Sequence, residues 1–326
     1  MRREGSYVSG VLWAILATAL WGATFLGPAA VAPVGPIYLV LGRYVVFGIL
    51  SVILLAINRH QVKSMGPRRV FVAMHLGVVG YIGFYLFFSF AAALGGGALA
   101  SIATGAMPAV ITIVSNLLRK ELRWRVLALP LAITTSGLLV LNTRPAGDGE
   151  GGTTTDVIGA TLLAIAACVV WSYFVVVNGR LIKQLDVAVV SNTTWTALIG
   201  TGAFVASIAL VPFAAAGGGA DPRDDTNTLI RFVIVSVLLA TLGSWSASWS
   251  WNKATTRLST VVMGQLIAME TLFGAAFNLL WEGRWPTATE LLGAALVTTG
   301  VLWCVFMFER NRASKRRITY QDASSG

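Results

Sequence analysis

Ten long apolar stretches dominate this sequence of 326 residues. They are bounded by Pro, Gly, Asn and charged residues, and they cover residues 9–30, 36–57, 70–91, 97–118, 126–142, 157–178, 188–212, 229–251, 260–281 and 289–308. A helix of about 20 apolar residues can cross the hydrocarbon core of a bilayer. Only 12% of the residues are charged, about half the share in a water-soluble domain, so most of the surface must face something other than water. The sequence therefore predicts an all-α integral membrane protein with ten transmembrane helices.

The basic residues predict the orientation of the chain, because Lys and Arg accumulate in short loops on the cytoplasmic side. With the N-terminus inside, nineteen of the 24 basic residues fall at inner loops, four fall at outer loops, and Arg43 lies within the second stretch. This bias predicts that both termini are cytoplasmic, and it accounts for the net charge of +10 without a nucleic-acid partner. Residues 309–326 then form a polar, basic cytoplasmic tail, which we expect to be disordered beside the membrane.

The two halves of the chain show a weak internal repeat. A shift of 150 residues places Trp21 on Trp171, and a shift of 161 aligns two Glu-x-Arg-Trp motifs that begin at Glu121 and Glu282. Each half holds five stretches, an odd number, so the second half must enter the membrane from the opposite side. The sequence predicts one five-helix repeat over residues 1–145 and a second, inverted repeat over residues 146–308. Chance matches between apolar segments are the alternative.

Several short motifs resemble a known family. They are Leu20-Trp21-Gly22, Leu41-Gly42-Arg43-Tyr44, Met107-Pro108-Ala109-Val110, and Glu282 followed by Gly293 and Gly300. Residues 9–308 thus resemble the drug/metabolite transporter superfamily, and within it the EamA-like ten-helix transporters. The resemblance implies a secondary transporter with a cavity between two five-helix units. The family often has a proline in the middle of the ninth helix, where this chain has Ala268-Met269-Glu270-Thr271.

Two ionisable residues inside the stretches are candidates for substrate binding or coupling, because a charge at a helix centre costs about 2.5–3.5 kcal/mol on insertion scales. Glu270 lies midway through residues 260–281, where a carboxyl group could alternate between its protonated and ionised forms. Arg43 could hold a substrate carboxylate in a bidentate pair, or neutralise Glu270 between substrates. A purely structural role in bonding a neighbouring helix is the alternative for both residues.

Aromatic and amide side chains are further candidates for the wall of a cavity. Trp21 and Trp171 occupy equivalent repeat positions, whereas Trp245 and Trp249, like Tyr81 and Tyr85, are spaced i, i+4 on one helix face. Such a lining would suit an aromatic or amphipathic solute, or a cation held over ring faces. Gln265 adds a polar group that would be costly facing lipid, so we expect it to line the cavity. Ordinary packing between helices is the alternative for each aromatic residue.

Three functions fit these features. The first is a secondary transporter of the inner cell membrane that exports or exchanges small organic metabolites by alternating access, with or without protons. Amino acids, related amphipathic or aromatic solutes and drugs are its candidate substrates. The second is a membrane-embedded enzyme or lipid-handling protein, which lacks His-Glu-x-x-His, Gly-x-Ser-x-Gly and Walker motifs. The third is a passive solute channel.

The two cysteines and two histidines are not clustered, so we expect no metal and no cofactor.

Overall fold

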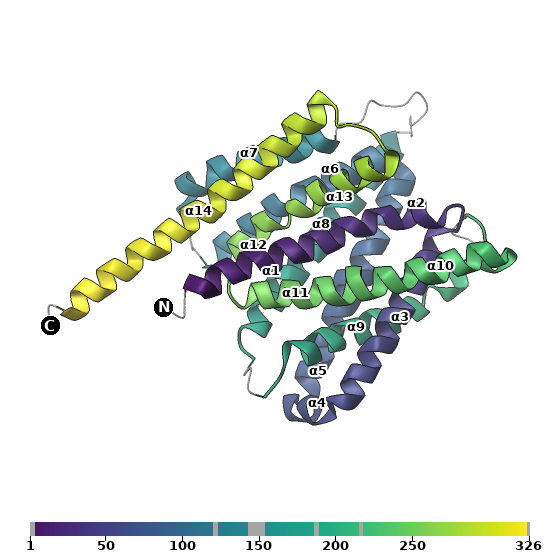
Figure 1. Ribbon diagram of the computed structural model, residues 1–326, viewed down its shortest axis with the longest axis horizontal. Coiled ribbons are helices and arrows are strands. Elements are labelled where there is room, and N and C mark those ends of the chain that lie inside the picture. Colours follow the sequence, from purple (N-terminus) through teal and green to yellow (C-terminus); the bar gives the residue numbers. More distant parts are fainter. Residues whose placement is uncertain (1–3, 120–122, 143–153, 186–188, 215–217, 325–326) are drawn as a thin grey trace.

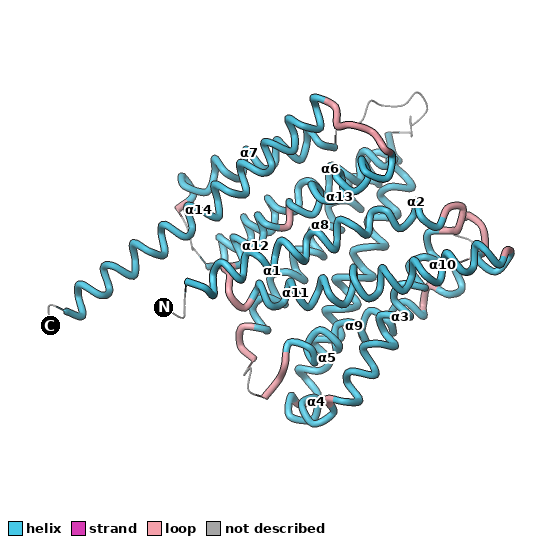
Figure 2. Tube along the Cα trace, viewed as in Figure 1, coloured by secondary structure: helices cyan, strands magenta, loops and turns pink. Residues whose placement is uncertain are grey.

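The computed structural model describes residues 4–119, 123–142, 154–185, 189–214 and 218–324, and these residues form an all-α fold (Figures 1 and 2). Eight helical segments of the described chain are long and apolar enough to cross a membrane: Tyr7–Val31, Pro36–Ile57, Pro67–Ala91, Trp124–Leu141, Thr155–Ile182, Thr226–Thr255, Thr260–Glu282 and Ala288–Arg310. Gly105–Leu118 is a shorter apolar helix. The prediction of an all-α membrane protein is confirmed, and a helix lies in each of the ten predicted stretches.

The first half of the chain forms the elements α1 (Glu4–Ala23), η1 (Thr24–Leu26), α2 (Gly27–Val31), α3 (Pro36–Ile57), α4 (Arg59–Met65), α5 (Pro67–Gly77), η2 (Val78–Gly83), α6 (Phe84–Arg119) and α7 (Trp124–Asn142). Proline occupies the start of α3 and α5, where its missing N–H would have no partner in any case. η2 is a π-helix that continues directly from α5 into α6.

The second half forms α8 (Thr154–Ile182), α9 (Asn192–Ile208), η3 (Val211–Phe213), η4 (Pro222–Asp224), α10 (Thr226–Leu238), η5 (Leu239–Ser246), α11 (Ala247–Thr255), α12 (Thr260–Leu266), α13 (Met269–Glu282) and α14 (Ala288–Ser324). Side chains of Ser191, Asp225 and Ser259 cap the first turns of α9, α10 and α12. α13 ends at Gly283, whose φ of 63° is the left-handed conformation that glycine adopts without strain.

Two boundaries differ from those that the sequence predicts. The backbone of α6 is helical from Phe84 to Arg119, across residues 92–96, where a connection was expected. Glycines there lower helix propensity by about 1 kcal/mol each but keep every backbone N–H. Residues 309–324, for which disorder was expected, are helical instead, because α14 continues to Ser324 through a segment without Gly or Pro. Glu121, which begins the first Glu-x-Arg-Trp motif, lies outside the described residues.

The helices pack in a pattern that relates the two halves. α7 lies against α14 along one edge of the molecule (Figure 1), and α3 lies against α9. α1 packs on α11 and α13, just as α8 packs on η2 and α6. The α7–α14 contact is reciprocal in detail: a Cβ on Gly137 would lie 2.6 Å from the amide nitrogen of Val297, and one on Gly300 would lie 2.7 Å from that of Thr134. Small residues thus allow close backbone approach at matching places.

Candidate functional site

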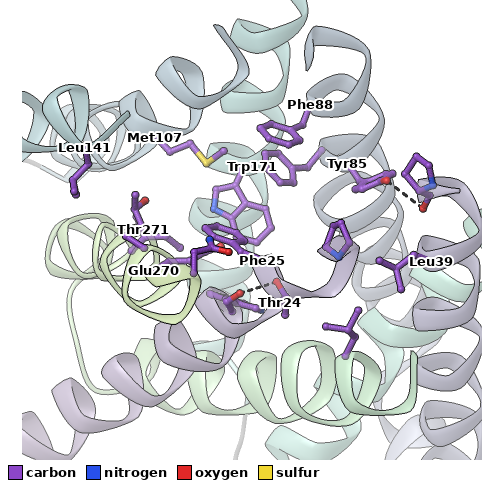
Figure 3. A pocket seen from close by; sticks show the side chains of 18 of the residues that line it. Thr24, Phe25, Leu39, Tyr85, Phe88, Met107, Leu141, Trp171, Glu270 and Thr271 are labelled. Atoms are coloured by element: carbon purple, nitrogen blue, oxygen red, sulfur yellow. Dashed lines mark hydrogen bonds between the residues drawn. The ribbon is translucent and has the colours of Figure 1, made fainter. Parts of the chain in front are cut away.

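A cavity of about 1330 Å³ lies where the two halves meet. Its lining comes from both halves, including α1, α3, η2 and α6 from the first half and α8, η5 and α13 from the second. Figure 3 shows Trp171, Phe25, Glu270 and Met107 around its central part. Cavities of this size bind small molecules, and their polar groups set the chemistry of the ligand.

Aromatic rings form much of the wall. The indoles of Trp21 and Trp171 meet edge to face, with centroids 5.8 Å apart and planes at 74°. Phe84 lies 5.2 Å from Trp171 between ring centroids, and Tyr81 lies 6.4 Å from it. The Tyr81 hydroxyl is hydrogen-bonded to that of Ser248. This wall therefore offers ring faces and edges to an apolar or cationic part of a ligand.

Arg43 lines the cavity from α3 and is held by the second half of the chain. Its Nε donates a hydrogen bond to Ser244 Oγ over 2.7 Å, and its Nη2 donates to the carbonyl oxygen of Gly243 over 3.2 Å. The guanidinium also lies 5.6 Å from the centroid of the Tyr44 ring. No carboxylate of the described residues forms an ion pair with it.

Glu270 lines the same cavity from the first turn of α13. Its backbone N–H donates to the carbonyl of Ile267, but no hydrogen bond or ion pair joins its carboxyl group to another side chain of the described chain. Arg43 lines the same cavity from α3. In Figure 3 the Glu270 side chain lies beside those of Phe25 and Thr271 and below the Trp171 indole. A carboxyl group so placed is available to a ligand or a proton.

A cluster of charged residues borders one end of the cavity, between α13 and α14. Arg284 donates from Nη1 and Nη2 to the two carboxylate oxygens of Glu290, over 2.9 and 2.7 Å, and also pairs with Glu282. These two carboxylates raise the pKa of the Arg284 guanidinium above its usual range. All three residues line the cavity, so this end is polar. The side chains are partly exposed, so water and salt screen these pairs, and they set the charge of this end of the cavity more than they stabilise the fold.

The opposite end is closed by packed and hydrogen-bonded side chains. Trp251 is buried against Trp21, with ring centroids 5.2 Å apart. Beyond it, Asn178 accepts a hydrogen bond from Trp195 Nε1 and donates to Asn252 Oδ1, both over 2.8 Å. Asn252 in turn donates to Thr196 Oγ1 over 3.0 Å. All of these side chains are buried, so the network ties α8, α9 and α11 together below the cavity.

Nearer the N-terminus of α1, a second cluster joins the two halves at this closed end. The ring of Trp13 meets that of Trp249 edge to face, with centroids 5.4 Å apart. Lys253 Nζ lies 4.2 Å from the Trp249 centroid and 5.2 Å from that of Trp13. The Trp249 indole donates to Thr193 Oγ1 over 3.3 Å. Within the described part of the chain, packed side chains thus close this end of the cavity, whereas the partly exposed Arg284 cluster lines the other end.

The two π-helices, η2 and η5, occupy corresponding places in the two halves. They begin at Val78 and Leu239, and 239 − 78 = 161, the shift that aligns the Glu-x-Arg-Trp motifs. In each, the amide that comes directly after the π-helix bonds carbonyls three and five residues back and skips the one four residues back. The skipped carbonyls belong to Gly80 and Gly243. π-Turns are rare and occur frequently at functional sites.

These two glycines make reciprocal contacts with the first helix of the other half. A Cβ on Gly80 would lie 2.5 Å from the Phe174 ring, and one on Gly243 would lie 2.2 Å from Thr24 Cγ2. Phe174 and Thr24 each lie three residues after one of the paired tryptophans. The contacts of the two halves therefore match at the cavity as well as at the α7–α14 edge.

Six of the nine candidate residues from the sequence line the cavity together: Glu270, Arg43, Trp21, Trp171, Tyr81 and Tyr85. Gln265 does not, because it is fully buried between helices, where it accepts from Thr134 and donates to Thr112. Trp245 packs against the main core, and Trp249 belongs to the closed end. The sequence did not point to Ser244 or Gly243, whose contact with Arg43 depends on the π-helix.

Comparison with models of known families places the chain in one family. Residues 8–143 and 158–306 match the model of the EamA-like transporter family. The chain is similar to the inner membrane protein YtfF of Escherichia coli K12, with 26% identity over 310 residues that cover 91% of this chain and 95% of YtfF. A crystal structure of another protein shares the fold, with a TM-score of 0.72 and 18% identity, over 94% of this chain and 99% of the other.

Proposed function

Because this chain belongs to the EamA-like transporter family, we propose that it is a secondary transporter that moves small organic solutes through the cavity by alternating access. The observation that carries the proposal is the cavity itself, which is open at the Arg284 end and closed at the Trp251 end. A site that can be reached from one side while packed side chains close the other is what alternating access requires.

The two halves supply the second arrangement that such a cycle needs. We propose inverted repeats over residues 1–145 and 146–308, and the two ranges matched by the family model support that division. The reciprocal contacts at Gly80 and Gly243, and at Gly137 and Gly300, support a two-fold relation. In the second arrangement the contacts at the Trp251 end separate and equivalent contacts form at the Arg284 end.

With both termini in the cytoplasm, the open end of the cavity faces the outside of the inner membrane. The distribution of Lys and Arg supports this orientation. The closed end then faces the cytoplasm, with Lys253 and Trp13 at its border. In the proposed cycle, this arrangement is the state in which an exported solute leaves or an exchanged solute enters.

The substrate that fits best is an amphipathic or aromatic solute of amino-acid size. Ring faces of Trp21 and Trp171 suit an apolar group, while Arg43 and Glu270 offer one positive and one acidic partner. Drugs and other metabolites with the same features remain candidates. Proton coupling would use Glu270, whose carboxyl group has no protein partner among the described residues.

The test is solute counterflow in sealed proteoliposomes that contain only this protein, with amino acids, nucleosides and quaternary amines as a panel. We expect saturable flux of at least one class, inhibited by unlabelled solute and recovered chemically unchanged. Flux without saturation or competition would indicate a passive channel. Conversion of the solute would indicate a membrane-embedded enzyme. Absence of flux for every class, in protein that remains folded, would contradict the proposal.

A further inference from the structure

We propose that Ser244 and Gly243 are positioning residues for Arg43, and that Arg43, held by them, binds a carboxylate group of the substrate. The inference rests on the proposed function, because it assigns one part of the ligand site in the cavity. It adds two residues from η5 that no sequence motif marks, and it names the chemical group that the site selects.

The first step is the geometry of η5. In an α-helix the amide of Ala247 would bond the carbonyl of Gly243, four residues back. Here that amide bonds the carbonyls of Leu242 and Ser244, and the Gly243 carbonyl accepts from Arg43 Nη2. The π-helix thus turns a backbone acceptor toward α3. The fully buried hydroxyl of Ser244 adds a second acceptor at Nε, 2.7 Å away.

The second step is the set of donors that remains. A guanidinium has five N–H groups, and these two bonds use the one on Nε and one on Nη2. Both N–H groups of Nη1 and one of Nη2 are left at the far end of the fork. That end can hold two oxygens of a planar anion in parallel hydrogen bonds. Fixing Nε at Ser244 also reduces the side-chain entropy that binding would otherwise cost.

The third step distinguishes a carboxylate from a phosphate. Arg284 also lines the cavity, but it already binds the carboxylates of Glu282 and Glu290. Among the described lining residues, Arg43 is therefore the cation without a carboxylate partner, and Glu270 shares its cavity. One guanidinium balances a singly charged carboxylate. A doubly charged phosphate would be repelled by the acidic group of Glu270, and its second negative charge would have no cation to balance it.

The closing experiment measures competition and kinetics in proteoliposomes with L-phenylalanine as the transported probe. Benzoate, its neutral counterpart benzamide, and phenyl phosphate serve as competitors. We expect benzoate to inhibit flux at least tenfold more strongly than the other two. Ser244→Ala should raise KM for L-phenylalanine about tenfold with kcat unchanged and should abolish the preference for benzoate over benzamide. Ser244→Thr, which keeps a hydroxyl, should restore both values.

A matched control comes from Ser236, in α10, whose buried hydroxyl has no hydrogen-bond partner among the described residues. Ser236→Ala should leave KM and the competitor preference unchanged. Equal inhibition by benzoate and benzamide, stronger inhibition by phenyl phosphate, or an unchanged preference in Ser244→Ala would overturn the inference. Saturable flux of other solutes that neither L-phenylalanine nor benzoate inhibits would overturn this inference but would leave the proposed transport function standing. Absence of all saturable flux would overturn the proposed function as well.

Discussion

Trp21 and Trp171 touch each other across the junction of the two halves, ring edge against ring face. A shift of 150 residues, which aligns the first helix of one half with the first helix of the other, superposes these same residues. Equivalent residues that meet must lie close to the axis that relates the two units. The axis therefore passes through the cavity, where Tyr81 and Phe84 pack on the same indole. In the proposed mechanism, the ligand site then lies at the point about which the halves would move.

Replacement of Glu270 tests proton coupling. Gln keeps the shape of the side chain but cannot ionise, so we expect Glu270→Gln to fold normally and to remove the pH dependence of transport. Flux between acidic and neutral pH would be measured in proteoliposomes. Glu309→Gln, at an exposed site in α14 outside the cavity lining, is the control and should keep the wild-type profile. A wild-type profile in Glu270→Gln would remove Glu270 from the coupling step.

Asn178 and Asn252 form a buried hydrogen-bonded pair at the closed end, so we predict that substitutions of these two residues have non-additive effects on the free energy of unfolding. Asn252→Ala leaves Nδ2 of Asn178 without its acceptor, and Asn178→Ala leaves Oδ1 of Asn252 without its donor, although each amide keeps its other hydrogen bond. A buried polar group without its partner costs about 1–3 kcal/mol. We expect each single variant to lower the melting temperature in detergent, and the double variant to lose less than the sum of the two. An interaction free energy of about 0.5–3 kcal/mol is typical of residues in one network. Strict additivity would show that the two amides stabilise the protein independently.

Close helix packing predicts that some glycines cannot be replaced. A Cβ on Gly77 would lie 1.9 Å from the carbonyl oxygen of Ile199, which belongs to the backbone of α9 and cannot rotate away. We expect Gly77→Ala to destabilise the protein by about 1–3 kcal/mol or more, through forced separation of α5 and α9. The measurement is thermal unfolding in detergent.

Gly159 is the matched control for that substitution. A Cβ there would meet only Leu94 Cδ1, at an ordinary contact distance of 3.5 Å. Since alanine favours a helix over glycine by roughly 1 kcal/mol, Gly159→Ala should keep or slightly raise stability. Equal losses in the two variants would contradict the packing of α5 on α9.

The helices and the main cavity residues could be predicted from the sequence. Long apolar stretches, and charged residues inside them, can be recognised without knowing how the helices pack. Arg43 and Glu270 are conspicuous in apolar stretches, and the repeat drew attention to Trp21 and Trp171. The placement of these four residues in one cavity agrees with the inverted packing that the repeat predicts.

For other residues, the sequence did not predict which way the side chain points, because this depends on how the helix is rotated about its axis. A π-turn inserts about one extra residue, which rotates the next part of the helix by roughly 100° relative to a regular α-helix. Trp245 lies within η5 and Trp249 lies after it, so the i, i+4 spacing of a regular α-helix does not predict which way either ring faces relative to the cavity. The position of Gln265 could not be predicted for a different reason: its hydrogen-bond partners Thr112 and Thr134 lie on helices that are remote in sequence.

The inverted arrangement of the halves is tested most directly by labelling Arg123 and Arg284, the equivalent arginines of the two Glu-x-Arg-Trp motifs. Each would be changed to Cys in a background with Cys168→Ala and Cys304→Ala, and treated with a membrane-impermeant maleimide. Both positions are exposed. We expect Arg284→Cys to react in intact cells and Arg123→Cys to react only in inside-out vesicles. Reaction of both cysteines from the same side would contradict the inverted repeat and the alternating-access function built on it.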